Sequence, residues 1–199
     1  MDKKQGKIDI IVGCMFSGKT TELIRRIRRI NHINKNVMVI NYQQDTRYGE
    51  NKIFTHDREG IDSIQVMKLN EITENHYDKY KDVDVIGINE GQFFPDLFEF
   101  CKNACENDHK TIIVSGLDGD YLRKPFGQIL DLIPISNSVQ RLNAFCQLCK
   151  DGTPAYFTRR IVNSNEKILI GGIDSYIPVC RYHYNQCIDE STSTRELSR

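Results

Sequence analysis

The chain has 199 residues, which is long enough to bury a substantial core but too short for two large domains. Lysine and arginine number 27, as do aspartate and glutamate, so the general basic excess typical of non-specific nucleic-acid binding is absent. The N-terminal segment lacks the apolar core of a secretory signal, and no stretch approaches the roughly 20 apolar residues that cross a bilayer. We therefore expect a cytoplasmic protein with one main domain and a small appendage.

The sequence reads as alternating strands and helices up to about residue 142. Strands are predicted over residues 7–12, 37–42, 83–88 and 111–115. Helices are predicted over residues 20–33, 70–80 and 96–107. Strands that are apolar nearly throughout and separated by helices indicate a parallel sheet covered on both faces, so we expect an α/β fold.

Two further regions depart from this alternation. Residues 46–62 show no clear period and are predicted to form a long loop, which in a compact domain is usually functional. Short β-prone pieces around cysteines follow residue 142 and predict a small zinc-ribbon-like unit. We expect an α/β domain over residues 1–142, a zinc-binding unit over 143–187 and a disordered tail over 188–199.

A phosphate-binding loop is the clearest motif, and together with the alternating strands and helices it predicts an α/β fold of the P-loop NTPase-like class. Residues 13–20 fit G-x-x-x-x-G-K-[ST] and lie between a predicted strand and a predicted helix, as phosphate binding requires. Backbone N–H groups of such a loop surround the phosphates, Lys19 reaches the β- and γ-phosphates, and the Thr20 hydroxyl ligates Mg²⁺. The predicted ATP-binding residues of the loop are Gly13, Cys14, Met15, Phe16, Ser17, Gly18, Lys19 and Thr20.

The helix after the loop carries Arg25, Arg26, Arg28 and Arg29. A nucleic-acid-binding stripe is one interpretation of these arginines. Their places between the apolar positions of an amphipathic helix favour a solvated or subunit-facing surface instead.

Polar residues follow directly after the predicted strand 83–88, at the sheet edge where ligands of open α/β folds bind. Glu90 is the acid immediately available there, and we expect it to deprotonate an incoming hydroxyl. Asn89 and Gln92 beside it are predicted to contact ATP. Arg47, in the long loop after the second strand, either neutralises charge on the transferring phosphoryl group or forms an exposed salt bridge, and Arg58 has the same two interpretations.

The seven cysteines are odd in number and follow no signal sequence, which favours reduced thiols and a metal site. Cys146 and Cys149 form one pair at metal-ligand spacing, and Cys180 and His183 form another. Thiolates with an imidazole are typical zinc ligands, and four protein ligands leave no open position, so the ion is expected to be structural. Thirty residues separate the pairs, so the intervening loop must do more than close the site.

Taken together, these motifs resemble the zinc-containing thymidine kinases of animals, bacteria and large DNA viruses. The likeness covers residues 7–184. Its motifs are Met-Phe-Ser-Gly-Lys-Thr at 15–20, Asp-Thr-Arg-Tyr at 45–48, Thr-His-Asp-Arg at 55–58, Glu-Gly-Gln-Phe-Phe-Pro-Asp at 90–96, Leu-Asp-Gly at 117–119, Arg-Lys-Pro-Phe-Gly at 123–127, Ile-Gly-Gly at 170–172 and the two zinc pairs.

The resemblance implies transfer of the ATP γ-phosphate to the 5′-hydroxyl of thymidine, with Mg²⁺, and with Glu90 as general base. The side chains that it implies around thymine are Met15, Phe94, Leu117, Tyr121, Phe126 and Tyr176. Backbone contacts to the base are implied for Lys167, Ile168, Leu169, Ile170 and Gly171, in a loop that closes over the nucleoside and is anchored by zinc. A homotetramer and feedback inhibition by thymidine triphosphate are also implied.

This sequence departs from the family pattern at three positions. Asn89 stands where aspartate is usual, which affects the surroundings of Mg²⁺. His183 replaces a frequent cysteine, and Tyr121 stands where phenylalanine is common. Two alternative functions are a zinc-ribbon nucleic-acid-binding ATPase, which the balanced charge disfavours, and a kinase for another deoxynucleoside, because a few pocket contacts decide specificity.

Overall fold

A computed structural model describes residues 5–45, 52–54, 60–162 and 174–186 of the chain. Its centre is a parallel sheet of six strands in the order β5-β2-β6-β7-β1-β8. The strands are β1 (Lys7–Gly13), β2 (Val37–Tyr42), β5 (Ile64–Val66), β6 (Val85–Ile88), β7 (Thr111–Gly116) and β8 (Ser138–Leu142). The predicted class of fold, a parallel sheet with helices on both faces, is confirmed.

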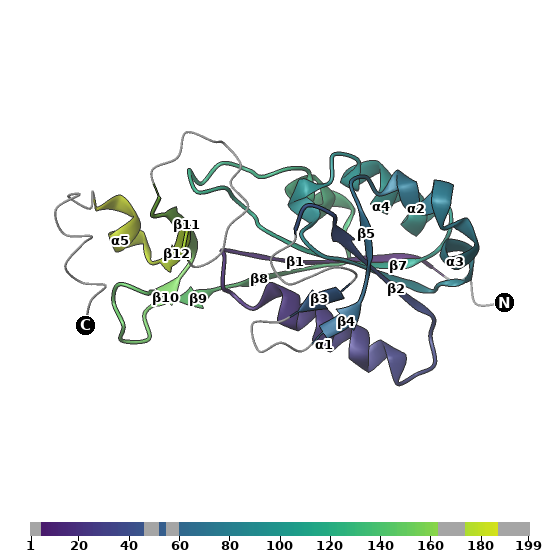
Figure 1. Ribbon diagram of the computed structural model, residues 1–199, viewed down its shortest axis with the longest axis horizontal. Helices are drawn as coiled ribbons and strands as arrows, with labels where there is room; N and C mark the ends of the chain where they lie inside the picture. Colours follow the sequence, from purple (N-terminus) through teal and green to yellow (C-terminus); the bar gives the residue numbers. More distant parts are fainter. Residues whose placement is uncertain (1–4, 46–51, 55–59, 163–173, 187–199) are drawn as a thin grey trace.

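Helices cover both faces of this sheet (Figure 1). One face carries α1 (Lys19–Asn31) and the hairpin strands β3 (Lys52–Phe54) and β4 (Gly60–Asp62). The other face carries α2 (Asn70–Asn75), α3 (Tyr77–Asp82), α4 (Leu97–Glu106) and the 3₁₀ segment η2 (Ile129–Ile135).

The alternation of side chains along β1 explains how one strand serves both layers. Ile8 and Ile10 are buried in the cluster that contains the α4 side chains, whereas Ile11 is buried against Leu23 and Ile27 of α1. Successive strand residues point to opposite faces, so a strand covered on both sides must be apolar at nearly every position. The same requirement makes the central strands recognisable in the sequence.

A smaller unit follows the sheet. It contains β9 (Ala144–Phe145), β10 (Pro154–Ala155), β11 (Phe157–Arg160), β12 (Tyr176–Val179) and α5 (Arg181–Asn185). The pairs β9–β10 and β11–β12 are antiparallel. Its apolar cluster also includes Cys14 of the phosphate loop, with Phe16 packed against it, so the loop forms part of the core of the smaller unit.

Three predictions of secondary structure were wrong in detail. Part of the predicted loop 46–62 forms β3 and β4, whose Ile53 and Ile61 pair and pack on the α1 face; strands of three residues are too short to show a period. The predicted helix 70–80 is two helices, because His76 between them has φ −127° and ψ 28°. The edge strands β5 and β8 were missed, since β8 is largely exposed and lacks a buried apolar run.

Candidate active site

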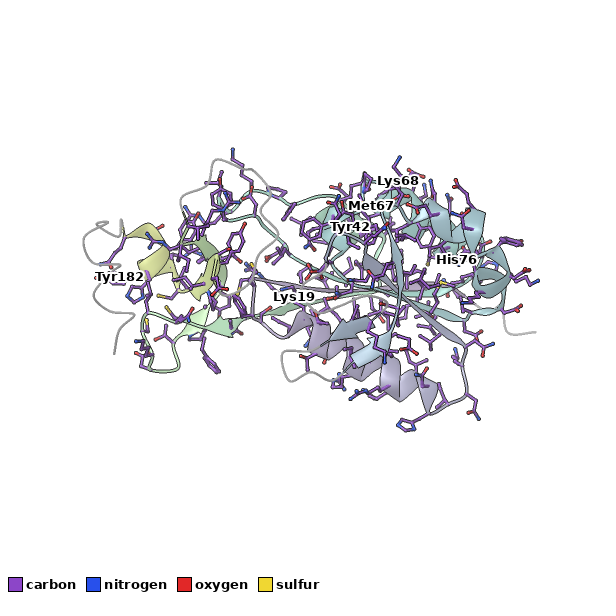
Figure 2. The ribbon with its side chains drawn as sticks, in the orientation of Figure 1. Lys19, Tyr42, Met67, Lys68, His76 and Tyr182 are labelled. Carbon is purple, nitrogen blue, oxygen red and sulfur yellow. The ribbon has the colours of Figure 1, made fainter. Side chains whose placement is uncertain are left out.

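The phosphate loop joins β1 to α1 at the carboxyl end of the sheet, and Figure 2 labels Lys19 on the side of the sheet toward the smaller unit. The Lys19 ammonium donates to the Cys14 carbonyl over 2.7 Å, and the Ser17 hydroxyl donates to the same oxygen over 2.8 Å. These bonds curl the loop on itself and hold the buried ammonium beside it. A positive group at a loop that opens a helix is suited to bind polyphosphate.

A chain of amide side chains connects this loop to two neighbouring strands. The Thr20 hydroxyl donates to Asn89 Oδ1 over 3.2 Å, and Asn89 Nδ2 donates to Asn41 Oδ1 over 2.9 Å. Asn41 in turn donates to Gln65 Oε1 over 3.2 Å. Asn89 therefore lies beside the hydroxyl predicted to ligate Mg²⁺, at the carboxyl ends of β2 and β6, where the sequence placed it.

Glu90 follows directly and has a left-handed backbone, with φ 54° and ψ 42°. Such a conformation costs a non-glycine residue of order 1 kcal/mol and is found disproportionately at functional sites. Its carboxylate accepts a bond from Gln92 Nε2 over 2.6 Å, and Gln92 Oε1 accepts from the Leu117 N–H over 2.9 Å. Glu90 is half-buried, so a carboxylate stands at the same end of the sheet as the phosphate loop.

Aromatic rings gather next to this carboxylate. Tyr42 stacks on Phe93 with centroids 5.1 Å apart, and Phe93 meets the Phe126 ring edge-on at 5.4 Å. Phe94 is 1% exposed and belongs to the main core, whereas Phe93 and Phe126 are half-buried. Of the adjacent phenylalanines, Phe93 is the one that offers ring surface outside the core.

Strand β11 contacts both the phosphate loop and the aromatic side chains predicted around thymine. The Thr158 hydroxyl accepts a hydrogen bond from the Met15 N–H over 3.0 Å. Arg160 donates to the Tyr176 hydroxyl over 2.9 Å, and its guanidinium carbon lies 3.8 Å from the centre of the Tyr121 ring. The predicted pocket residues Met15, Tyr121 and Tyr176 are therefore held around one strand.

A small hollow adjoins the phosphate loop at Cys14. It has a volume of about 120 Å³ and is lined by Cys14, Asp118, Gly119, Asp120, Arg123, Arg141, Tyr156, Phe157 and Thr158. Asp118 and Arg141 in its wall form an ion pair of 2.8 Å. The volume is well below the roughly 300 Å³ at which pockets usually enclose a small-molecule ligand, so we assign it none.

The two predicted zinc pairs converge in the smaller unit. One ligand atom from each of Cys146, Cys149, Cys180 and His183 lies within 4.8 Å of all the others. His183 Nδ1 is 3.3 to 3.4 Å from the three sulfurs, and the sulfurs of Cys149 and Cys180 are 3.8 Å apart. Tetrahedral zinc with bonds of about 2.3 Å to sulfur places two sulfurs about 3.8 Å apart. The donor set and its spacing therefore fit a structural zinc ion.

Without a metal ion the neighbouring thiols of Cys146 and Cys149 titrate in opposite directions: burial raises the pKa of Cys149, whereas the pKa of Cys146 is lowered. Burial by itself raises the pKa of the Cys146 thiol, but backbone N–H bonds from Cys180, Cys149 and Leu148 outweigh burial and lower the pKa to about 6. Donors directed at the sulfur stabilise a thiolate, which is the form that binds metal.

Several predicted site residues lie outside the described residues. They are Arg47, Arg58, Lys167, Ile168, Leu169, Ile170 and Gly171. Conversely, sequence reasoning missed Asn41, Thr158 and Arg160, because their partners are distant in the chain: Thr158 lies 143 positions from Met15. The asparagine at the end of a buried strand was the available signal for Asn41.

The fold and the site define a phosphate-loop nucleotide-binding protein with a carboxylate at the sheet edge and a zinc-ligand cluster in a smaller unit. The family model for thymidine kinase matches residues 6–184. The chain belongs to the thymidine kinase family.

Three curated relatives illustrate the similarity. Thymidine kinase 1 of Dictyostelium discoideum is 45% identical over 194 residues, covering 96% of this chain and 82% of the relative. The cytosolic thymidine kinase of Homo sapiens is 44% identical over 182 residues, with coverage of 92% and 74%. The thymidine kinase of Variola virus is 45% identical over 179 residues, with coverage of 90% and 97%.

Among the helices of the described residues, none combines the length and the apolar character needed to cross a membrane.

Proposed function

We propose that this protein transfers the γ-phosphate of ATP to the 5′-hydroxyl of thymidine, giving thymidine monophosphate for DNA synthesis through nucleotide salvage. The observation that carries the proposal is the family match over residues 6–184, which includes the phosphate loop, Glu90 and the zinc-ligand pairs. The alternative of a nucleic-acid-binding ATPase has no support in this match.

The carboxyl end of the sheet supplies the groups for phosphoryl transfer. Backbone N–H groups of residues 13–20 and the Lys19 ammonium would bind the ATP phosphates. Oxygen ligands suit Mg²⁺, so the Thr20 hydroxyl would hold the ion, with Asn89 bonded to that hydroxyl and close to the ion's shell. Glu90 would take the proton from the 5′-hydroxyl, and Arg47 would stabilise charge on the phosphoryl group.

The nucleoside pocket is proposed from the side chains around β11 and the aromatic group. Met15, Leu117, Tyr121, Phe126 and Tyr176 keep their predicted roles as thymine contacts, together with the backbone of residues 167–171. For the phenylalanine pair we propose Phe93 as the contact and Phe94 as its support, because Phe94 is buried in the core against Tyr42 at 5.5 Å.

Zinc would be held by Cys146, Cys149, Cys180 and His183 and would act by fixing structure, because four protein ligands exclude substrate. Its position supports the proposed division into an α/β domain over residues 1–142 and a zinc-binding unit over 143–187. Arg159 of β11 donates to the His183 carbonyl over 2.6 Å, so the metal site and the strand beside the nucleoside pocket are joined.

By family membership we also propose a homotetramer, feedback inhibition by thymidine triphosphate at the active site, and a cytoplasmic location without membrane or stable nucleic-acid contacts. The cytosolic enzyme of Homo sapiens is among the relatives that support the location. Gel filtration with light scattering tests the assembly: a mass near four chains is expected, and a monomer would contradict it.

A nucleoside panel tests the proposed function. The purified protein is incubated with ATP, Mg²⁺ and each common deoxynucleoside, and the products are identified by mass spectrometry. Thymidine monophosphate is the expected main product. If another nucleoside is phosphorylated in preference, the proposed substrate is wrong but the kinase activity stands. If DNA stimulates ATP hydrolysis and no nucleotide product forms, the proposed function is wrong.

A further inference from the structure

We infer that Gln92 is a positioning residue for Glu90: its side-chain amide fixes the orientation of the Glu90 carboxylate and keeps it ionised for proton transfer. The inference rests on the proposed role of Glu90 as general base. It gives Gln92 a function that differs from the ATP contact predicted from the sequence.

The direction of the Gln92 amide is determined by its partners. Its Oε1 faces the Leu117 N–H at 2.9 Å and its Nε2 faces Glu90 Oε2 at 2.6 Å. A backbone N–H can donate but not accept, so the amide oxygen must face Leu117. The NH₂ group must then face the carboxylate. The reversed amide would oppose donor to donor at Leu117 and oxygen to oxygen at Glu90.

Close packing holds this side chain in one place. Gln92 is 3% exposed, and the Glu90 carboxylate that accepts its bond is half-buried. A β-carbon at Gly116 would overlap the Gln92 amide oxygen, and one at Gly127, which has φ +60°, would overlap the Gln92 carbonyl. Glycine at position 116 therefore leaves the space that the Gln92 amide fills, and glycine at position 127 leaves room for the Gln92 backbone.

The bond has a chemical consequence at the base. Donation to a carboxylate stabilises its charged form, so Gln92 lowers the pH at which Glu90 becomes protonated. Leu117 is also a predicted thymine contact. The same amide therefore connects the general base Glu90 to the backbone of the nucleoside pocket. Orientation of this kind raises the rate of the bound complex without a comparable effect on substrate affinity.

The first experiment compares Gln92→Met with Gln128→Met. Methionine has similar length but cannot make either amide bond. Gln128 is a matched control, because its Oε1 also accepts a hydrogen bond from a backbone N–H, that of Phe98 at 3.0 Å. Gln128 is far from Glu90 in the sequence and has no proposed part in catalysis. For Gln92→Met we expect kcat to fall by roughly tenfold to a hundredfold, with KM for ATP and thymidine nearly unchanged. The control Gln128→Met should keep the kcat, the KM values and the Tm of the unmodified protein.

The second readout is the acidic limb of the pH dependence of kcat, which a merely structural role of Gln92 would not move. In Gln92→Met it should shift upward by about one pH unit. Gln92→Glu, which places a second carboxyl against Glu90, should shift it further because like charges disfavour ionisation. An unchanged limb in both variants, or a rise in KM for ATP as the main effect, would overturn the inference and favour a direct nucleotide contact.

A titration that needs no activity separates this inference from the proposed function. The carboxyl carbon of Glu90 is followed by ¹³C NMR, with its resonance assigned through Glu90→Gln. A higher Glu90 pKa in Gln92→Met supports the inference, and an identical pKa in the two proteins overturns it. If thymidine is not phosphorylated at all, the proposed function fails while this comparison still decides whether Gln92 controls Glu90.

Discussion

The Met15 N–H of the phosphate loop donates to the Thr158 hydroxyl of β11 over 3.0 Å, across 143 positions of sequence. Next along the same strand, Arg159 donates to the carbonyl of the zinc-ligand candidate His183. The Cys14 thiol also donates to the Ala155 carbonyl over 3.3 Å. The zinc-ligand cluster and the phosphate loop are therefore connected through a few hydrogen bonds, which makes metal loss relevant to phosphate binding.

Removal of zinc should weaken catalysis before it unfolds the sheet. We expect one zinc per chain, and Cys146→Ser should lose most of it because one thiolate ligand is absent. Hydrogen exchange should then rise in β11 and β12 while β1 and β7 stay protected. Metal analysis measures the bound zinc, exchange mass spectrometry measures the opening of β11 and β12, and kcat measures the loss of catalysis. Cys105→Ser, at a half-buried helix cysteine, is the control and should retain zinc. Full zinc in Cys146→Ser would disprove the assigned ligand.

Glu90→Gln should remove turnover while ATP and thymidine still bind. The amide keeps the size of the side chain but cannot take a proton, and a general base contributes roughly 10² to 10⁴-fold. Steady-state kcat together with calorimetric binding of each substrate distinguishes lost chemistry from lost affinity. A variant with nearly normal kcat would require another base.

The sequence predicted best what depends on local pattern. The bounds 37–42 of β2 were predicted without error, because both faces of that strand are buried and its first four residues are apolar. The phosphate loop and the zinc pairs were found by the spacing of a few residues together with their local context, since their chemistry needs particular residues a few positions apart.

What the sequence did not reveal depends on long-range packing. Gln92 stands in an apparent turn, and its bond to the Leu117 N–H appears only when η1 (Gly91–Phe93) is placed beside the end of β7. Arg160 follows Arg159 in the chain, and nothing in the sequence distinguishes them. Strand alternation directs Arg159 to α5 and Arg160 to the Tyr121 ring.

Arg160→Met should raise KM for thymidine. The arginine holds the Tyr176 hydroxyl at 2.9 Å and stacks 3.8 Å from the Tyr121 centre, so its loss frees two proposed thymine contacts. We expect kcat/KM for thymidine to fall roughly tenfold, with KM for ATP unchanged. Arg160→Lys should recover little, since an ammonium cannot stack as a planar guanidinium does. Arg29→Met, at an exposed position of α1, is the control. Equal effects of the two methionine variants would refute the role of Arg160 in thymidine binding.

Glu22 should contribute stability that depends on pH. Hydrogen bonds from Arg25 at 2.6 Å and Arg26 at 2.8 Å lower the pKa of its carboxyl to about 2. A depressed carboxyl pKa stabilises the fold above the ordinary pKa of about 4.5, and this stability disappears as the pH falls toward 2.

Denaturation of Glu22→Gln checks this contribution. At pH 7 the variant should be less stable by about 1 kcal/mol, as expected for a partly exposed ion pair, and the difference from the unmodified protein should narrow below about pH 4.5. Glu74→Gln, at an exposed position of α2, should match the unmodified protein throughout. A difference independent of pH would show that Glu22 acts by packing instead of charge.

Asn89→Asp should strengthen the response to Mg²⁺. Asn89 Oδ1 accepts from the Thr20 hydroxyl, so a carboxylate at this position would add charge next to the expected metal ligand. The substitution removes the donor to Asn41, but Asn41 and Gln65 can both turn their amides, because the chain ends at the Ser63 hydroxyl, which donates or accepts; the turn gives up only the long 3.5 Å bond from Asn41 Nδ2 to the Tyr42 carbonyl. The fold should therefore accommodate the aspartate with little loss of Tm.

Two kinetic changes are expected from Asn89→Asp. The Mg²⁺ concentration for half-maximal rate should fall, because a charge-assisted bond to the metal's shell is stronger than a neutral one. The acidic limb of the kcat profile should move upward, since a new negative charge beside Glu90 disfavours its ionised form. One assay over a grid of Mg²⁺ and pH measures both, with Asn103→Asp on the exposed face of α4 as the control. If neither quantity changes, Asn89 lies outside the influence of both the metal and the base, and its bond to Thr20 serves structure alone.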